Sequence, residues 1–74
     1  MKFYVTVGND KVNDIKENVF KTLDEAYDYA LNDIRFVLCE NGLTKAGIDN
    51  LINGFKLTNK LRVGFNWWTM WIGV

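Results

Sequence analysis

The C-terminal segment FNWWTMWIGV restricts this chain to folds in which one strand presents two chemically different faces. Successive side chains of a strand point to opposite faces, so the segment divides into two sets. One set is apolar throughout and consists of Trp68, Met70, Ile72 and Val74. The other set is mixed and consists of Trp67, Thr69 and Trp71. We expect the apolar set to pack against helices and the mixed set to face away from them.

The preceding segment LRVG is predicted to pair with this strand in an antiparallel hairpin with a two-residue turn at Phe65–Asn66. The resulting pairs are Val63 with Trp68 and Leu61 with Met70 on the core face, and Gly64 with Trp67, Arg62 with Thr69 and Lys60 with Trp71 on the other. This turn requires a positive φ at Phe65, which is uncommon for a bulky residue. A loop that begins at Gly64 would change the pairs and leave the two faces unchanged.

The size and composition of the chain limit how it can be stabilised. A chain of 74 residues buries only about 60% of its unfolded surface, and such small domains usually need a disulfide, a metal or a partner. One cysteine cannot form an intramolecular disulfide, and the absence of histidine excludes zinc sites built from Cys and His. The residues are 49% hydrophobic and 15% aromatic, so we predict one compact domain over 1–74 with an aromatic core, and no metal or cofactor.

The N-terminal part of the chain predicts a hairpin followed by a long helix. Residues 3–7, FYVTV, form the first expected strand, with Phe3, Val5 and Val7 facing inward, and residues 12–20 form the second. TLDE at 22–25 is a capping box, in which the Thr22 hydroxyl and the Glu25 carboxylate each reach the backbone of the other residue. An apolar face at helical spacing then extends to Leu38, and NG at 41–42 ends the helix with a left-handed cap.

A second, shorter helix is expected to begin after Thr44 and to end at Gly54, and the remainder is β. The predicted fold is a small α+β domain in the order β-β-α-α-β-β, with an antiparallel sheet that packs one face on two helices. The expected core is Phe3, Val5, Val7, Leu23, Tyr27, Ala30, Ile34, Val37, Leu51, Leu61, Val63, Trp68, Met70 and Ile72. The segment FKTLDEAYDYA resembles a recurrent pattern of small bacterial and phage proteins in which a hairpin leads into a helix, and this resemblance implies a fold only.

The sequence lacks the groups that most enzymes use. There is no histidine for acid–base chemistry at neutral pH, no GxSxG elbow and no Walker-type glycine loop. Cys39 falls in the middle of the first helix without a partner that would lower its pKa. We therefore expect no catalytic residue. A lone cysteine, an N-terminus without a long apolar run and no apolar stretch near ~20 residues predict a cytoplasmic protein that does not enter a membrane.

Three surfaces are candidates for binding a partner, and one of them is a sheet edge, where a strand of another chain can pair. The first helix combines carboxylates with two aromatic residues far from its apolar face, and these are Asp24, Glu25, Asp28, Tyr29, Asp33 and Phe36. Such a face suits a basic protein, unless the second helix covers the aromatic residues. The second surface is the outer face of the sheet, which is expected to hold Lys60, Arg62, Trp67 and Trp71, with Tyr4 on a neighbouring strand.

We expect a non-enzymatic protein-binding module. Its size suggests, by analogy alone, a phage or mobile-element inhibitor of host defence machinery, similar in role to anti-CRISPR proteins. The alternative is single-stranded nucleic-acid binding, because aromatic residues interleaved with cations stack on bases and attract phosphates. Few basic residues are available to attract phosphates. Residues 41–74 contain four Lys or Arg and one Asp, while residues 1–40 contain five Lys or Arg and eight Asp or Glu. A third hypothesis is that the chain forms a homodimer through the aromatic face or through a sheet edge.

Overall fold

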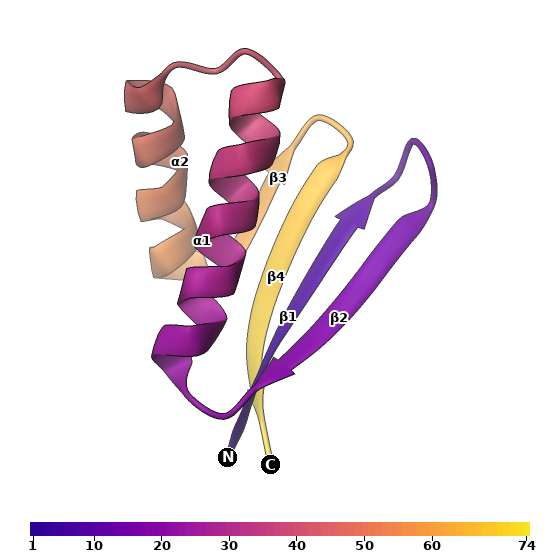
Figure 1. The fold of residues 1–74 in the computed structure, drawn as a ribbon, viewed down its shortest axis with the longest axis vertical. Helices are drawn as coiled ribbons and strands as arrows, with labels where there is room; N and C mark the ends of the chain where they lie inside the picture. Colours follow the sequence, from indigo (N-terminus) through magenta and orange to yellow (C-terminus); the bar gives the residue numbers. More distant parts are fainter.

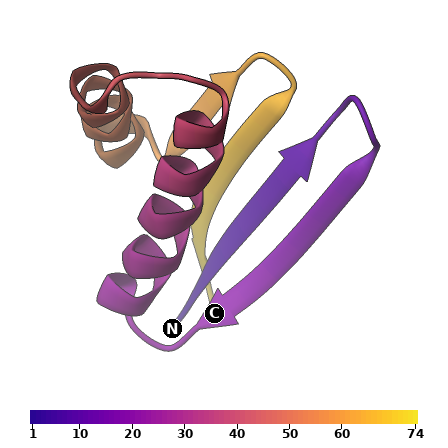
Figure 2. The same cartoon turned by 45° about the horizontal axis from the view of Figure 1, so that its top comes forward.

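The computed structural model describes residues 1–74 and has the order β-β-α-α-β-β. The elements are β1 (Lys2–Asn9), β2 (Asp14–Phe20), α1 (Leu23–Glu40), α2 (Lys45–Thr58), β3 (Lys60–Val63) and β4 (Asn66–Gly73). The strands form one antiparallel sheet in the order β2-β1-β4-β3, so the first and last strands pair at its centre. Both helices pack on one face and leave the other face open (Figures 1 and 2). The predicted fold class is confirmed.

The first hairpin forms as the alternation in FYVTV predicts. Val5 is completely buried, and Phe3 and Val7 pack against the core. β2 begins at Asp14, two residues later than expected, because the chain turns through Asn13, whose φ of 54° is left-handed. Asparagine visits this region more readily than most residues, so it suits the turn. β2 is one edge of the sheet and β3 is the other.

Helix α1 has the predicted caps, with one difference. The Thr22 hydroxyl accepts a hydrogen bond from the Glu25 amide at 3.2 Å, but the Glu25 carboxylate accepts from the Thr22 hydroxyl at 2.9 Å instead of from the Thr22 backbone. At the other end Gly42 has a φ of +84°, and the Leu43 amide donates to the Leu38 carbonyl at 3.1 Å. This is the left-handed cap expected from NG.

Helix α2 begins as predicted and ends later. Thr44 accepts a hydrogen bond from the Gly47 amide at 3.2 Å, but the helix continues past Gly54 to Thr58. Glycine in a helix interior costs about 0.5–1 kcal/mol relative to alanine, and burial of the next residue, Phe55, outweighs this cost. The left-handed residue that ends the helix is Asn59, with a φ of 60°.

The core lies between the helices and the inner face of the sheet. Its buried residues are Val5, Ala26, Ala30, Ile34, Leu38, Ile48, Ile52, Phe55, Trp68 and Met70. Most of the predicted core residues either belong to this set or pack against it. The prediction that Leu23 and Ile72 belong to the core is wrong, since their exposed fractions are 39% and 54%. Leu23 begins α1 and Ile72 is near the chain end, where the helices no longer cover the sheet (Figure 1).

The β3–β4 hairpin has the predicted faces and a different register. Its turn is Gly64–Phe65, with Gly64 at a φ of +61°, so Phe65 avoids the positive φ that the expected turn required. The pairs are Lys60 with Thr69, Leu61 with Trp68, Arg62 with Trp67 and Val63 with Asn66. A shift of two residues keeps each side chain on its face, so the division of the tryptophans is confirmed.

Neither helix combines the length and apolar character that crossing a membrane requires.

Candidate functional site

The face of the sheet that no helix covers is the candidate site, and we call it the open face. Alternation and register give its members, which are Ile15, Glu17 and Val19 of β2, Lys2, Tyr4, Thr6 and Gly8 of β1, Trp67, Thr69, Trp71 and Gly73 of β4, and Lys60 and Arg62 of β3. Lys60, Arg62, Trp67 and Trp71 therefore share one face, as the sequence predicts. Tyr4 joins them because it pairs with Trp71.

Trp67 lies against the backbone of β1. A Cβ atom added to Gly8 would lie 2.1 Å from Trp67 Cε2, so the indole occupies the space that any other residue would fill. The indole Nε1 donates to the Asp10 carboxylate at 3.0 Å. Packing on Gly8 and this hydrogen bond together fix the orientation of the ring.

Trp71 is held in a second way. Its ring stacks on Tyr4 with centroids 3.9 Å apart and planes inclined by 6°. Both rings also lie close to Gly73, where an added Cβ would be 2.8 Å from Tyr4 Cε2 and 3.1 Å from Trp71 Cζ3. Glycine at this position leaves room for the stacked pair. Cross-strand aromatic pairs of this kind stabilise a sheet and restrict the rotamers of both residues.

Apolar side chains extend the aromatic surface across β2. Ile15 is 66% exposed and Val19 is 51% exposed, while Trp71 is 44% exposed. Ile15 is in the row of Gly8 and Trp67, and Val19 is in the row of Tyr4 and Trp71. An exposed apolar patch that spans several strands is unusual for a lone monomer, which makes this face a candidate interaction surface.

Most charges of the open face lie at its two sides, and Lys2 lies at the start of the inner strand β1. Arg62 donates to the Asp10 carboxylate at 2.7 Å, and hydrogen bonds from Arg62 and then from Trp67 lower the pKa of Asp10 below its usual value. Glu17 on β2 accepts a hydrogen bond from Thr6 at 3.4 Å, and Lys60 on β3 forms no ion pair. The β2 side is therefore acidic and the β3 side basic.

A shallow hollow of about 290 Å³ lies beside Trp67 at the β3 side of the sheet. Its lining residues are Lys60, Leu61, Arg62, Trp67, Trp68 and Thr69. The hollow places polar and cationic groups next to an indole. It offers a place for a side chain or a base of a partner.

The acidic residues of α1 do not form one surface. Asp24, Glu25 and Asp28 are exposed near the start of the helix and form no ion pair. Asp33 lies on another side of the helix, where its carboxylate accepts a hydrogen bond from Nε1 of the buried Trp68 at 2.7 Å. The expected grouping of Asp33 with the other three is wrong, because Asp33 satisfies an indole N–H in the core.

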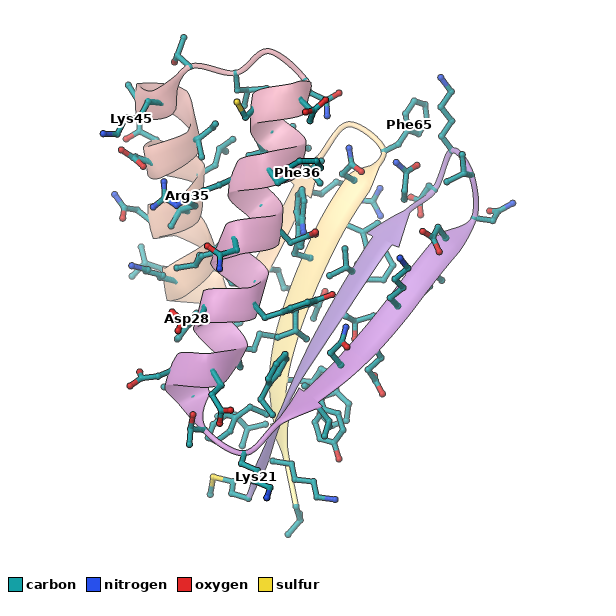
Figure 3. The ribbon with its side chains drawn as sticks, viewed as in Figure 1. Lys21, Asp28, Arg35, Phe36, Lys45 and Phe65 are labelled. Atoms are coloured by element: carbon teal, nitrogen blue, oxygen red, sulfur yellow. The ribbon has the colours of Figure 1, made fainter.

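Tyr29 and Phe36 have different environments. Tyr29 is half-buried, but β2 covers it and not α2: its hydroxyl accepts from Asn18 at 2.9 Å and its ring lies 5.4 Å from that of Phe20. Phe36 is 66% exposed and lies on the side of α1 away from α2 (Figure 3). Neither residue belongs to the open face.

The sequence reasoning missed several residues that shape the open face. Asp10 follows the first strand and has no local signal that it anchors both Arg62 and Trp67. Ile15, Glu17 and Val19 alternate at period two, and this signal in β2 would have placed them on one face. The role of Gly8 depends on the pairing of β1 with β4, which no local pattern reveals.

We compared the chain with protein-family models, curated proteins and solved structures, and none of them matches it. No group of three or more Cys, Asp or Glu side chains is placed to hold a metal ion.

Proposed function

We propose that this chain is a non-enzymatic protein-binding module whose binding surface is the open face. The observation on which the proposal rests is the patch of Tyr4, Trp67 and Trp71 with Ile15 and Val19 on a sheet face that no helix covers. Tryptophan, tyrosine and arginine are the residues that contribute most to protein–protein affinity. A patch of these residues with charges at its sides has the composition of an apolar interface centre with a polar rim.

Preorganisation of the aromatic rings supports this proposal. Trp67 is fixed by Gly8 and Asp10, and Trp71 is fixed by Tyr4 and Gly73. A partner that binds here would not have to order these side chains, and ordering a flexible side chain costs about 0.5–1.5 kcal/mol. The absence of histidine supports the non-enzymatic part of the proposal, and the lone exposed Cys39 supports a cytoplasmic location. A role as a phage inhibitor of host defence rests on analogy and stays a prediction.

Single-stranded nucleic-acid binding is the second candidate, and the hollow beside Trp67 with Lys60 and Arg62 favours it. The charges argue against it, because Asp10 pairs with Arg62 and Glu17 lies on the same face. With so few free cations, phosphate contacts would be few. Titration of the indole fluorescence with oligonucleotides at low salt tests this candidate, and an unchanged signal excludes it.

The main proposal is tested by capture of proteins from a lysate of the organism that encodes the chain. The immobilised wild type is compared with the double variant Ile15→Ser/Trp71→Ser, which makes the open face more polar. The matched control is Phe36→Ser/Leu57→Ser, which removes two exposed apolar side chains from the helices. Far-UV circular dichroism establishes that each variant is folded.

The proposal predicts a captured protein that the control variant retains and the open-face variant loses. If the open-face variant retains that protein, the open face is not the binding surface. Loss of the protein in Asp24→Asn/Asp28→Asn alone would assign binding to the exposed acidic start of α1.

A further inference from the structure

The charged residues of the open face are arranged to complement a second copy of the same face. One row across the sheet contains Glu17 of β2, Thr6 of β1, Thr69 of β4 and Lys60 of β3. Glu17 and Lys60 are at the two ends of this row, three strand spacings or about 14 Å apart. They are too far apart to pair with each other, and neither forms an ion pair within one copy.

Two orientations keep the strands of two copies aligned when the open faces meet about a two-fold axis in the plane between them. An axis perpendicular to the strands places β2 over β2 and β3 over β3. When this axis crosses the row of Glu17 and Lys60, Glu17 faces Glu17 and Lys60 faces Lys60, so like charges meet. An axis parallel to the strands, between β1 and β4, places β2 over β3, so Glu17 of each copy faces Lys60 of the other.

The apolar residues suit the second orientation as well. The same axis places Tyr4 over Trp71 of the other copy and Thr6 over Thr69, so an aromatic and hydroxyl-lined centre is covered by its equivalent. Ile15 lies over the aliphatic stem of Arg62. Two sheets related in this way have nearly aligned strands, which is one of the two common arrangements of packed sheets.

The size of the face is sufficient for a reversible contact. Four strands at a spacing of ~4.8 Å and about seven residues at ~3.3 Å give roughly 440 Å² in projection. A stable interface covers about 800 Å² of accessible surface on each partner, so we expect the dimer to exchange with monomers. We propose that in the absence of another partner a second copy of this chain occupies the open face, about a two-fold axis parallel to the strands. This inference rests on the proposed function of that face.

Charge reversal tests this orientation. Sedimentation velocity over a concentration series gives the dimer dissociation constant of the wild type, Glu17→Lys, Lys60→Glu and the double variant Glu17→Lys/Lys60→Glu. Each single reversal places like charges at both ends of the interface and is expected to weaken the dimer about tenfold or more. The double variant restores both opposite-charge pairs and should return to within about threefold of the wild type.

Three results would overturn the inference. The first is a wild type that sediments as a monomer up to about 1 mM, a concentration at which even a weak dimer with a Kd near that value is populated. The second is a dimer that both single reversals leave unchanged, and the third is a double variant that stays as weak as the singles. Any of these can occur while protein capture still depends on Ile15 and Trp71, in which case the proposed function stands without the dimer.

Discussion

Replacing Gly8 by alanine tests whether Trp67 rests on the backbone of β1. The new Cβ would lie 2.1–2.4 Å from three atoms of the indole, so the ring has to move away. One indole face is about a third of the 150–250 Å² that an aromatic side chain buries, or roughly 50–80 Å². Its return to water costs about 1–2 kcal/mol at ~25 cal/mol per Å².

This cost is opposed by the gain from removing a glycine from a strand, about 0.5–1 kcal/mol. Gly8→Ala should therefore destabilise the wild type by about 0.5–1 kcal/mol. In a Trp67→Ala background the clash is absent, and the same change should stabilise the protein by about 0.5–1 kcal/mol. The coupling between the two sites is then about 1–2 kcal/mol.

Urea unfolding followed by circular dichroism measures the free energy of unfolding of the wild type, both single variants and the double variant. The sign reversal of the Gly8→Ala effect between the two backgrounds is the expected result. A Gly8→Ala change that stabilises both backgrounds equally would refute the placement of Trp67 on Gly8. The preorganisation argued for the open face would fail with it.

Three further predictions follow from individual hydrogen bonds. Asp33→Ala should lower the free energy of unfolding by about 1–3 kcal/mol, because the buried indole N–H of Trp68 loses its acceptor. Asp33→Asn should lower it less, because asparagine retains a carbonyl oxygen that can accept this hydrogen bond. Asn59→Gly should cost about 1 kcal/mol in the same urea experiment, because the Tyr27 hydroxyl loses the Asn59 side-chain acceptor that it reaches at 3.1 Å. Asn59→Ala should cost about 1 kcal/mol more, because alanine also disfavours the left-handed φ. The lowered pKa of Asp10 means that its contribution to stability is complete above the ordinary value of 3.8 and is lost as the pH falls through the folded-state pKa. Arg62→Ala should reduce that loss in urea midpoints measured from neutral to acidic pH, and an unchanged acid-side slope would contradict the pairing.

The two faces of the C-terminal strand were predictable because alternation does not depend on register. Trp68 is buried and Trp71 is on the open face whichever turn joins β3 to β4. The register was not predicted, because it depends on which residue takes a positive φ. Glycine does so at little cost, and the preference of Gly64 over Phe65 moved every pair by two residues.

The content of the candidate site was harder to predict than its location. Lys60 and Arg62 were placed on the correct face, but the neutralisation of Arg62 depends on Asp10, which approaches only after β1 pairs with β4. Asp33 carries the same charge as Asp28, and only the packing of α1 on β4 separates a core hydrogen-bond acceptor from a solvent-exposed carboxylate. Side-chain contacts between distant segments decided each of these points.

The three indole N–H groups offer the most direct test of the open face as the binding surface. Trp67 and Trp71 lie on the open face, and Trp68 lies on the opposite face, bonded to Asp33, as an internal control. Two-dimensional NMR spectra of the ¹⁵N-labelled protein, recorded while the captured protein is added, follow one signal for each indole N–H. The proposed function predicts that the signals of Trp67 and Trp71 shift or broaden before that of Trp68. Unchanged Trp67 and Trp71 signals, with shifts confined to amides of α1, would contradict it.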